Sequence, residues 1–378
     1  MAYGDSLASE MRVDGDYPVV GSGGISGSHL SSNFRAPGIV VGRKGSYGSV
    51  HWLPLGGFAI DTAYYIDERL TSADLGWLYY VLQAVDLKGP SQDVGVPGLA
   101  REAAYEVPVP EPPPLEEQRR IADFLDAETS RLDDLVGLRQ VQFELIGERL
   151  AAKSAHLTGR IGIRSGVTCG VAQLRRAVSA VRTGFTPALL EDRSEDLASC
   201  SSLPWYTPAA VDGWMRLGPA GKMAHRAQGI AVFPKGSVLV TGIGESLGKV
   251  AYLDHVATGN QQLTAITPEI GVNGRFIAWQ LWAAEREIRE WAQYSRIRII
   301  NNDSLKSFPI HLPGRAVQDA VVLALDSQMG RARQLEDANH RFKRLAAERR
   351  QALITAAVTG QFDVSTASGR NTTEGITA

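Results

Sequence analysis

The sequence predicts two mixed α/β modules joined by two long helices that pack antiparallel as a coiled coil. The 378 residues exceed the length of about 150 that is usual for one domain. Residues 113–159 and 314–362 each carry apolar side chains at helical spacing. The segments before them, residues 1–112 and 160–313, contain short β-branched runs punctuated by glycine, which are typical of strands and tight turns. The chain is therefore predicted to run module, helix, module, helix.

The composition is that of an ordinary globular protein. Hydrophobic residues make up 44% of the chain and charged residues 21%. No apolar run approaches the ~18 residues that span a bilayer, and the N-terminus lacks the basic and apolar regions of a signal peptide. The two cysteines, Cys169 and Cys200, are too few for a disulfide framework, so we expect a cytoplasmic protein without a membrane partner. The net charge of −2 does not by itself indicate a nucleic-acid binder.

The two modules share an internal repeat. GIVVGRKGSYGSV at 38–50 aligns with VLVTGIGESLGKV at 238–250 when the offset is 200. In this alignment Val40, Gly42, Ser46, Gly48 and Val50 match Val240, Gly242, Ser246, Gly248 and Val250. The apolar stretches at 75–85 and 276–293 add at least one helix to each module. The two modules are therefore expected to share one fold.

The two long helices each carry an apolar stripe. The first stripe comprises Ile121, Leu125, Leu132, Leu135, Leu138, Phe143, Ile146 and Leu150, and the second Leu325, Met329, Leu335, Phe342, Leu345, Leu353 and Val358. Prolines precede both helices, and a Thr-Gly pair at 158–159 and again at 359–360 is a natural helix end. A long helix with one apolar face needs a partner, and the other helix is the economical one. The alternative is two separate helices, each covering its own module.

The stretch PPPLEEQRRIADFLDAETSRLD at 112–133 strongly resembles the central conserved helix of type I restriction–modification specificity subunits. The order of variable module and conserved helix, repeated once, is also that family's plan, and the resemblance extends from residue 1 to about 364. It implies a non-catalytic subunit that binds a bipartite duplex DNA target. It also implies two modification subunits that methylate adenine, and restriction subunits. The resemblance places S-adenosylmethionine and ATP on those partners, with neither bound by this chain.

Two ends of the chain depart from the repeated plan. The second module begins with LRRAVSAVRTGFTP at 174–187, which has no counterpart before YGDSL in the first module. We therefore expect the first module to be shortened at its N-terminus. The tail from residue 363 is polar and small and is expected to be disordered.

Candidate DNA-contacting residues are cations, which meet phosphates, and forked or amide side chains, which read base edges. In the first module they are Arg43, Lys44, Ser46 and Tyr47, and the alternative is a solvated basic turn. In the second module they are Lys222, His225, Arg226, Glu245, Ser246, Lys249, Gln261, Gln262, Arg296 and Arg298. An ordinary turn carboxylate at Glu245 and structural amides at the two glutamines are the alternatives. Glu116, Glu117, Arg119, Arg120 and Asp123 are candidate partner-binding residues, with a merely solvated helix face as the alternative.

Catalytic and metal-binding motifs are missing from the sequence. It has no GxxxxGK[ST] loop for ATP phosphates, no HExxH metal pair and no GxSxG nucleophile elbow. We therefore predict neither a catalytic residue nor a metal ligand. A second function from another class stays open, namely a degenerate scaffold that docks modification subunits without reading DNA.

Overall fold

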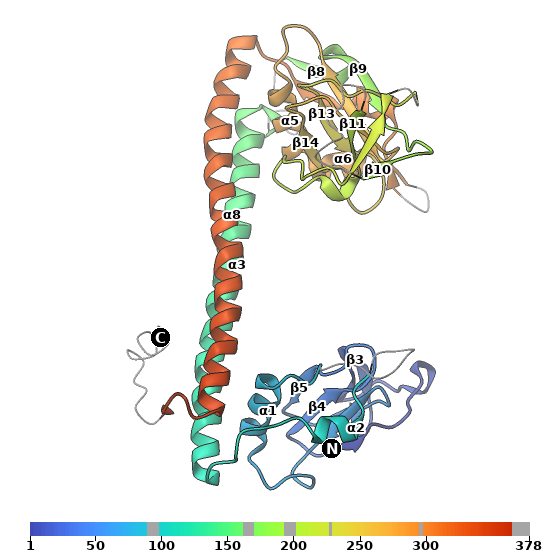
Figure 1. Ribbon diagram of the computed structural model, residues 1–378. Coiled ribbons are helices and arrows are strands. Elements are labelled where there is room, and N and C mark those ends of the chain that lie inside the picture. The colour runs from blue at the N-terminus through green and yellow to red at the C-terminus, as the bar shows by residue number, and fades with distance from the viewer. Residues whose placement is uncertain (89–97, 162–169, 193–201, 227–228, 295–297, 365–378) are drawn as a thin grey trace. The chain divides into compact units, whose positions relative to one another are not determined.

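A computed structural model describes residues 1–88, 98–161, 170–192, 202–226, 229–294 and 298–364 (Figure 1). The chain forms two compact units, one of residues 1–139 and 340–378 and one of residues 140–339. We call residues 1–112 module 1 and residues 160–313 module 2. Cys169, Cys200, Arg296 and the tail from residue 365 lie outside the described residues.

Module 1 consists of two sheets and two short helices. The four-stranded antiparallel sheet has the order β1 (Ala2–Tyr3), β7 (Ala63–Ile66), β4 (Gly38–Gly42), β5 (Val50–Leu53). The three-stranded sheet has the order β3 (Gly24–His29), β2 (Tyr17–Gly21), β6 (Phe58–Ala59). The helices are α1 (Leu75–Ala84) and α2 (Arg101–Tyr105), with a 3-10 turn, η1, at Ser9–Met11. Strand β4 is buried along its whole length because Val40 packs with Val20 of β2, while Ile39 packs on the side of α1.

Module 2 repeats these two sheets in the same strand order. The first sheet runs β14 (Val250–Tyr252), β13 (Val238–Thr241), β16 (Leu263–Pro268), β9 (Val178–Thr183). The second runs β10 (Glu191–Asp192), β12 (Lys222–His225), β11 (Ser202–Tyr206), β15 (Thr258–Gly259). The smaller pairs are β8 (Val171–Gln173) with β19 (Pro309–His311), and β17 (Gln293–Tyr294) with β18 (Arg298–Ile299). The helices are α5 (Gly274–Ala283), α6 (Glu285–Trp291) and α7 (Asn302–Ser307), with 3-10 turns η2 (Leu174–Arg176) and η4 (Pro208–Ala210).

The strand register corrects one detail of the predicted repeat. Val41 pairs with Val50 in module 1, and Val240 pairs with Val250 in module 2. The counterpart of Gly42 is therefore Thr241 rather than Gly242, and the turn in module 2 is one residue longer. A constant offset in the sequence hid this insertion because glycines stand on both sides of it. Both turns contain glycines with positive φ, such as Gly45 (φ 74) and Gly244 (φ 83).

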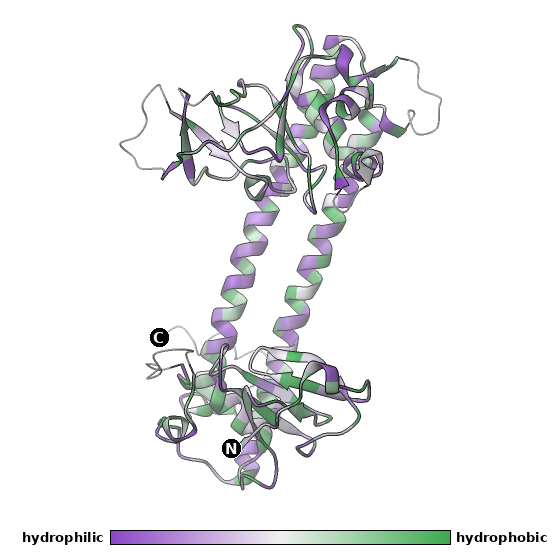
Figure 2. Ribbon diagram, turned by 90° about the vertical axis from the view of Figure 1, so that its right-hand side faces the viewer, coloured by the Kyte–Doolittle hydropathy of each residue, from purple (hydrophilic) through white to green (hydrophobic). Residues whose placement is uncertain are grey.

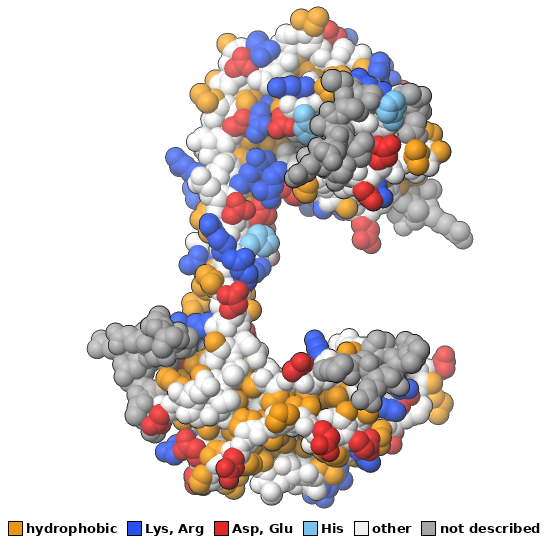
Figure 3. Space-filling view, in the orientation of Figure 1, with side chains coloured by type: hydrophobic (Ala, Val, Ile, Leu, Met, Phe, Trp, Pro, Cys, Tyr) orange, Lys and Arg blue, Asp and Glu red, His pale blue; other side chains and the backbone are white. Residues whose placement is uncertain are grey.

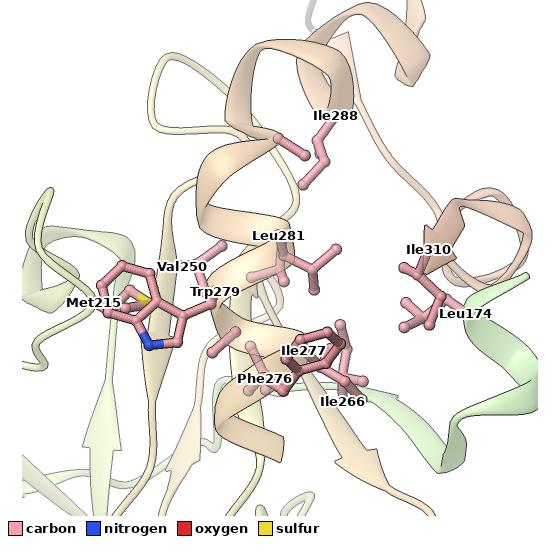
Figure 4. Packing of buried hydrophobic residues seen from close by; sticks show 14 of the residues in the cluster. Leu174, Met215, Val250, Ile266, Phe276, Ile277, Trp279, Leu281, Ile288 and Ile310 are labelled. Carbon is pink, nitrogen blue, oxygen red and sulfur yellow. The ribbon is translucent and has the colours of Figure 1, made fainter. Parts of the chain in front are cut away.

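The core of module 2 surrounds α5. Trp279, Phe276 and Ile277 extend from this helix and are fully buried (Figure 4). They pack in one cluster with Met215 and with Val250 of β14, among other residues. Burying an aromatic side chain of this size stabilises a fold by about 2–3 kcal/mol. The rim of this core is formed by the long helices.

The long helices α3 (Leu115–Leu157) and α8 (Arg315–Val358) each contribute one part to each unit. In the first unit Leu125, near the start of α3, packs in a cluster with Leu353 near the end of α8. In the second unit Leu150, near the end of α3, packs in a cluster with Leu325 near the start of α8. The two helices are thus antiparallel in both units, and the predicted fold class is confirmed. Each helix ends directly before its Thr-Gly pair, as predicted, and the glycines have positive φ (79 and 73).

The predicted apolar stripes were wrong in their central parts. Leu135 and Leu138 are 43% and 68% exposed, and Leu335 and Leu345 are 48% and 58% exposed. Figure 2 shows hydrophobic and hydrophilic residues alternating along both helices. The buried positions of α8 instead recur every seventh residue, at Gln318, Leu325, Ala332, Asn339, Ala346 and Leu353. Small and polar residues occupy this seam, so a search for large apolar residues alone drifted off it.

Candidate nucleic-acid interface

The basic turn between β4 and β5 presents cations beside an aromatic ring. Arg43 donates a hydrogen bond to the Asp61 carbonyl oxygen (3.2 Å), and its guanidinium lies 5.0 Å from the centre of the Tyr3 ring. The guanidinium of Arg101 lies over the same ring, also at 5.0 Å. Tyr3 is 43% exposed, so two cations and one ring reach the surface together. Arg101 and Tyr3 were not among the predicted residues.

The other predicted residues of module 1 share this turn. Lys44 and Ser46 are exposed, and the Lys44 backbone N–H donates to the Thr62 carbonyl oxygen (3.2 Å). The Tyr47 hydroxyl donates to the Lys88 carbonyl oxygen (3.4 Å). The structure therefore brings all four predicted residues of module 1 onto one loop whose backbone is hydrogen-bonded to the sheet.

The matching turn of module 2 carries a carboxylate and pairs with β18. Glu245 is exposed, while Ser246 and Lys249 are half-buried. The Gly244 N–H donates to the Arg298 carbonyl oxygen (3.2 Å), and the Ile300 N–H donates to the Gly242 carbonyl oxygen (2.9 Å). The structure thus brings exposed Arg298 to the turn of Glu245, although 56 other positions could not have been excluded from the sequence.

 The figure of 56 is the separation of Gly242 from Arg298 along the chain, and spacing alone does not predict a contact over that distance.

The two predicted amide readers lie in the loop before β16. The Gln261 side chain is exposed, and its carbonyl oxygen accepts a hydrogen bond from the Thr186 hydroxyl (2.7 Å). The Gln262 side chain accepts from the amide of Asn260 (3.0 Å), which is itself buried. Gln261 is therefore placed at the surface, whereas Gln262 is tied to its own loop.

Lys222 lies on β12 directly opposite Trp205 of β11. Its ammonium group forms an ion pair with Asp192 (3.0 Å), which offsets part of its charge. His225 ends the same strand and is half-buried, and Arg226 follows it at the surface. Arg296, the remaining predicted residue, lies outside the described residues.

Two aromatic residues that the sequence analysis missed connect Lys222 with Gln261. The Trp205 indole N–H donates to the carbonyl oxygen of Phe185 (3.2 Å), and Phe185 directly precedes Thr186. Phe185 is 52% exposed. Both residues stand in segments that the sequence analysis had noted for other reasons, and aromatic residues near candidate cations are the signal that could have found them.

The candidate partner-binding residues occupy the first turns of α3. Glu116 pairs with Arg119 (3.1 Å), Glu117 pairs with Arg120, and Asp123 is exposed. Exposed pairs three residues apart on a helix contribute only about 0.2–0.5 kcal/mol each. These charges are therefore available to a partner at little cost to the helix, and their partner role stays a prediction.

A glutamine fastens each module to its long helix in the same way. In the first unit the Gln118 side chain accepts from the backbone N–H of Asp74, the N-cap of α1, and donates to the Pro113 carbonyl oxygen (2.8 and 2.7 Å). In the second unit Gln318 accepts from the N–H of Asn273, the N-cap of α5, and donates to the Pro313 carbonyl oxygen (2.8 Å for both). We call this arrangement the glutamine clamp.

An aspartate one helical face further on completes each attachment. Asp126 accepts from the Tyr80 hydroxyl (2.6 Å), and Asp326 accepts from the Trp279 indole N–H (2.9 Å). Burial, followed by the hydrogen bond to Asp126, raises the pKa of Tyr80 well above its ordinary value, so this hydroxyl keeps its proton. The module and its helix are thus joined by polar contacts at equivalent places in both units.

Charge and metal chemistry add no enzymatic site to the described part of the chain. On the face seen in Figure 3, Lys and Arg side chains are interspersed with Asp and Glu. Within the described ranges, no group of three or more His, Cys, Asp or Glu side chains is arranged to hold a metal ion. None of the helices in those ranges is long and apolar enough to cross a membrane.

Comparison with known proteins assigns the chain. Residues 204–330 match the sequence model of the type I restriction modification DNA specificity domain. The chain shares its fold with a chain from a structure on complex assembly and conformational transition of the type I R-M system. That match has a TM-score of 0.67 at 15% identity and covers 92% of each chain. A comparison with curated proteins found no match.

Two further solved structures are similar at lower scores. The HsdS subunit from Thermoanaerobacter tengcongensis has a TM-score of 0.47 at 17% identity, covering 92% of this chain and 91% of that one. The S subunit from M. genitalium has a TM-score of 0.43 at 16% identity, covering 94% and 92%. The family match within module 2 and the fold shared over nearly the whole chain confirm the predicted resemblance to type I restriction–modification specificity subunits, with residues 204–330 forming a DNA specificity domain.

Proposed function

We propose that this chain recognises a bipartite duplex DNA target, with one half-site read by each module. The match of residues 204–330 to a DNA specificity domain carries this proposal. Module 1 lies outside the matched range, but its two sheets have the same strand order as those of module 2. A fold that reads DNA in one module is therefore available in the other.

The surface chemistry of the turns fits this role. Arg43, Lys44 and Arg101 offer cations for phosphates, and the forked guanidinium also suits guanine edges. Gln261 offers an amide for adenine and Glu245 a carboxylate for the amino group of cytosine. Because the two turns carry different side chains, the two half-sites are expected to be unlike.

The reaction itself belongs to the partners in this proposal. Two modification subunits supply adenine methylation with S-adenosylmethionine, and restriction subunits supply ATP-driven cleavage. The charged first turns of α3, from Glu116 to Asp123, are the proposed docking surface for a modification subunit. Methylating a base requires extruding it into a pocket, and that pocket is assigned to the partner.

A scaffold without DNA readout is the second candidate. The net charge of −2 and the ion pair that Asp192 forms with Lys222 favour it. DNA binding that weakens steeply with salt distinguishes the two functions, because phosphate contacts release counterions.

The test is co-expression of this chain with its modification subunit, followed by sequencing that detects methylated adenine in the host DNA. The modification subunit expressed alone is the control. A methylated motif in two defined parts separated by unread bases supports the proposal. Formation of the complex without any methylated motif would overturn it in favour of the scaffold.

A further inference from the structure

Phe185 is an apolar ring held at the surface of module 2 by a rigid backbone. It is 52% exposed and stands in the loop that follows β9. A single exposed apolar residue is ordinary on a protein surface. What distinguishes this one is how firmly its backbone is fixed and which side chains surround it.

Three features fix the backbone. The Phe185 N–H donates to the Gly259 carbonyl oxygen (2.8 Å), and the Phe185 carbonyl oxygen accepts from the Trp205 indole (3.2 Å). The preceding Gly184 donates to the Leu263 carbonyl oxygen (2.9 Å). A Cβ at residue 184 would lie 2.2 Å from the Gly259 carbonyl oxygen, so only glycine fits there. The ring is therefore presented with little conformational entropy left to lose on binding.

Polar groups suited to DNA flank the ring on both sides. Thr186 is the next residue, and its hydroxyl holds the side chain of Gln261 (2.7 Å). On the other side, Trp205 lies opposite Lys222 across β11 and β12. An amide that can read adenine and a cation that can meet a phosphate thus stand beside an apolar ring.

Module 1 shows that the fold does not require this ring. Asp5 occupies the equivalent position, since its N–H donates to the Ala59 carbonyl oxygen (2.9 Å) as that of Phe185 does to Gly259. The Asp5 carboxylate accepts from the Asn33 amide (2.8 Å). Val19, which is fully buried, stands where module 2 has Trp205. The aromatic pair is therefore a property of module 2 alone.

We propose that Phe185 contacts the methyl group of a thymine in the half-site that module 2 reads, beside an adenine read by Gln261. Apolar side chains such as phenylalanine make this contact in the major groove. The inference rests on the proposed function and deepens it, because it names a specificity-determining residue and the base it reads. Module 1, with Asp5 at this position, makes no such contact.

The experiment uses the complex with its modification subunits and the methylated motif found for the wild-type chain. The motif of the Phe185→Ala complex is determined in the same way, and its affinity for a duplex carrying the wild-type motif is measured. Phe185→Ala is expected to relax one thymine position in one half of the motif and to weaken binding about tenfold, as a mismatched base pair does. Phe185→Leu keeps an apolar side chain and is expected to retain most of the affinity. Ile270→Ala, at a module 2 residue that is 96% exposed, is the matched control and should change neither motif nor affinity.

Replacing that thymine by deoxyuridine tests the methyl contact directly. The substitution should weaken binding by the wild-type complex several-fold and leave binding by the Phe185→Ala complex unchanged. A loss with Phe185→Ala that is insensitive to deoxyuridine would overturn the methyl contact and favour insertion of the ring between base steps. An unchanged motif in Phe185→Ala would overturn the inference while leaving the proposed function intact. Lack of any motif for the wild-type chain would remove the proposed function itself.

Discussion

Module 1 and module 2 share their scaffold and differ in the side chains that the scaffold presents. Both have the same strand order, a glutamine clamp and an aspartate that receives a hydrogen bond from an aromatic side chain. At the reading turn, however, module 1 has two guanidiniums on Tyr3, whereas module 2 has Glu245 and the nearby Phe185. The comparison teaches that the repeat preserves how a module is built and attached, and leaves free what it can recognise.

The largest expected effects concern the shared core. Leu125 and Leu325 are fully buried at equivalent places on α3 and α8. Replacing either by alanine should destabilise its own unit by about 2–5 kcal/mol, because each leaves a cavity. Hydrogen exchange of the core strands in each unit measures the loss, with Leu138→Ala, at a residue 68% exposed, as the control. Equal protection in both units after Leu125→Ala would break the comparison.

The glutamine clamp should give a smaller and again matched effect. Gln118→Ala and Gln318→Ala each leave a backbone N–H at a helix N-cap without its acceptor. We expect about 1–3 kcal/mol of lost stability for each, the usual cost of a buried unsatisfied group. Faster exchange of the Asp74 amide in one variant and of the Asn273 amide in the other would confirm the equivalence. Gln334→Ala, at an exposed position of α8, should alter neither amide.

The response to acid should separate the modules. Burial raises the pKa of Asp67, but hydrogen bonds from the Arg69 side chain and from the Arg35 and Arg69 backbone outweigh it, so the pKa lies below its ordinary value. A lowered pKa stabilises the fold above the unfolded value of about 3.9, and this stability is lost as pH falls through the folded pKa. Module 2 has Thr267 at this place, so module 1 should lose protection first as the pH drops below about 4.

The measurement is hydrogen exchange of both modules over a pH series, corrected for the intrinsic rate. Asp67→Asn should lower the stability of module 1 at neutral pH and flatten its response to acid. Parallel loss of protection in the two modules, with or without Asp67→Asn, would contradict the assignment to this carboxylate.

The smallest expected effect concerns a single exposed cation of module 1. Lys44→Ala should weaken DNA binding by the complex a few-fold, to a similar extent on every sequence, because a phosphate contact carries no base information. The slope of log affinity against log salt should become shallower by about 1. Titrations at several salt concentrations measure both, with Lys153→Ala on α3 as the control. A change in sequence preference would instead make Lys44 a base reader.

The sequence predicted what depends on periodicity and missed what depends on contacts between distant segments. The repeat, both long helices and their Thr-Gly ends follow from local pattern, and the fold confirmed them. The seam of α8 was missed because Ala332, Asn339 and Ala346 carry no large apolar side chain. The one-residue insertion in the turn was missed because the strand pairing, and not the glycine spacing, reveals it.

The candidate site was predicted less completely than the fold. Arg43 and its neighbours stood together on one turn and were found from the sequence. Arg101 reaches the same ring from α2, and Trp205 meets Phe185 across two loops, so their proximity exists only in the folded chain. Local sequence does not encode such meetings.

The paired ends of the two reading turns have a consequence for engineering. The Val41–Val50 and Val240–Val250 pairs lie at the same place in the sheet, although the turns between them differ in length. A turn cut at these valines can be transplanted from one module to the other as a cassette, since neither graft shifts a strand by a residue and turns its buried face outward. The same two cuts therefore define an exchangeable unit for building chimeras with rearranged recognition.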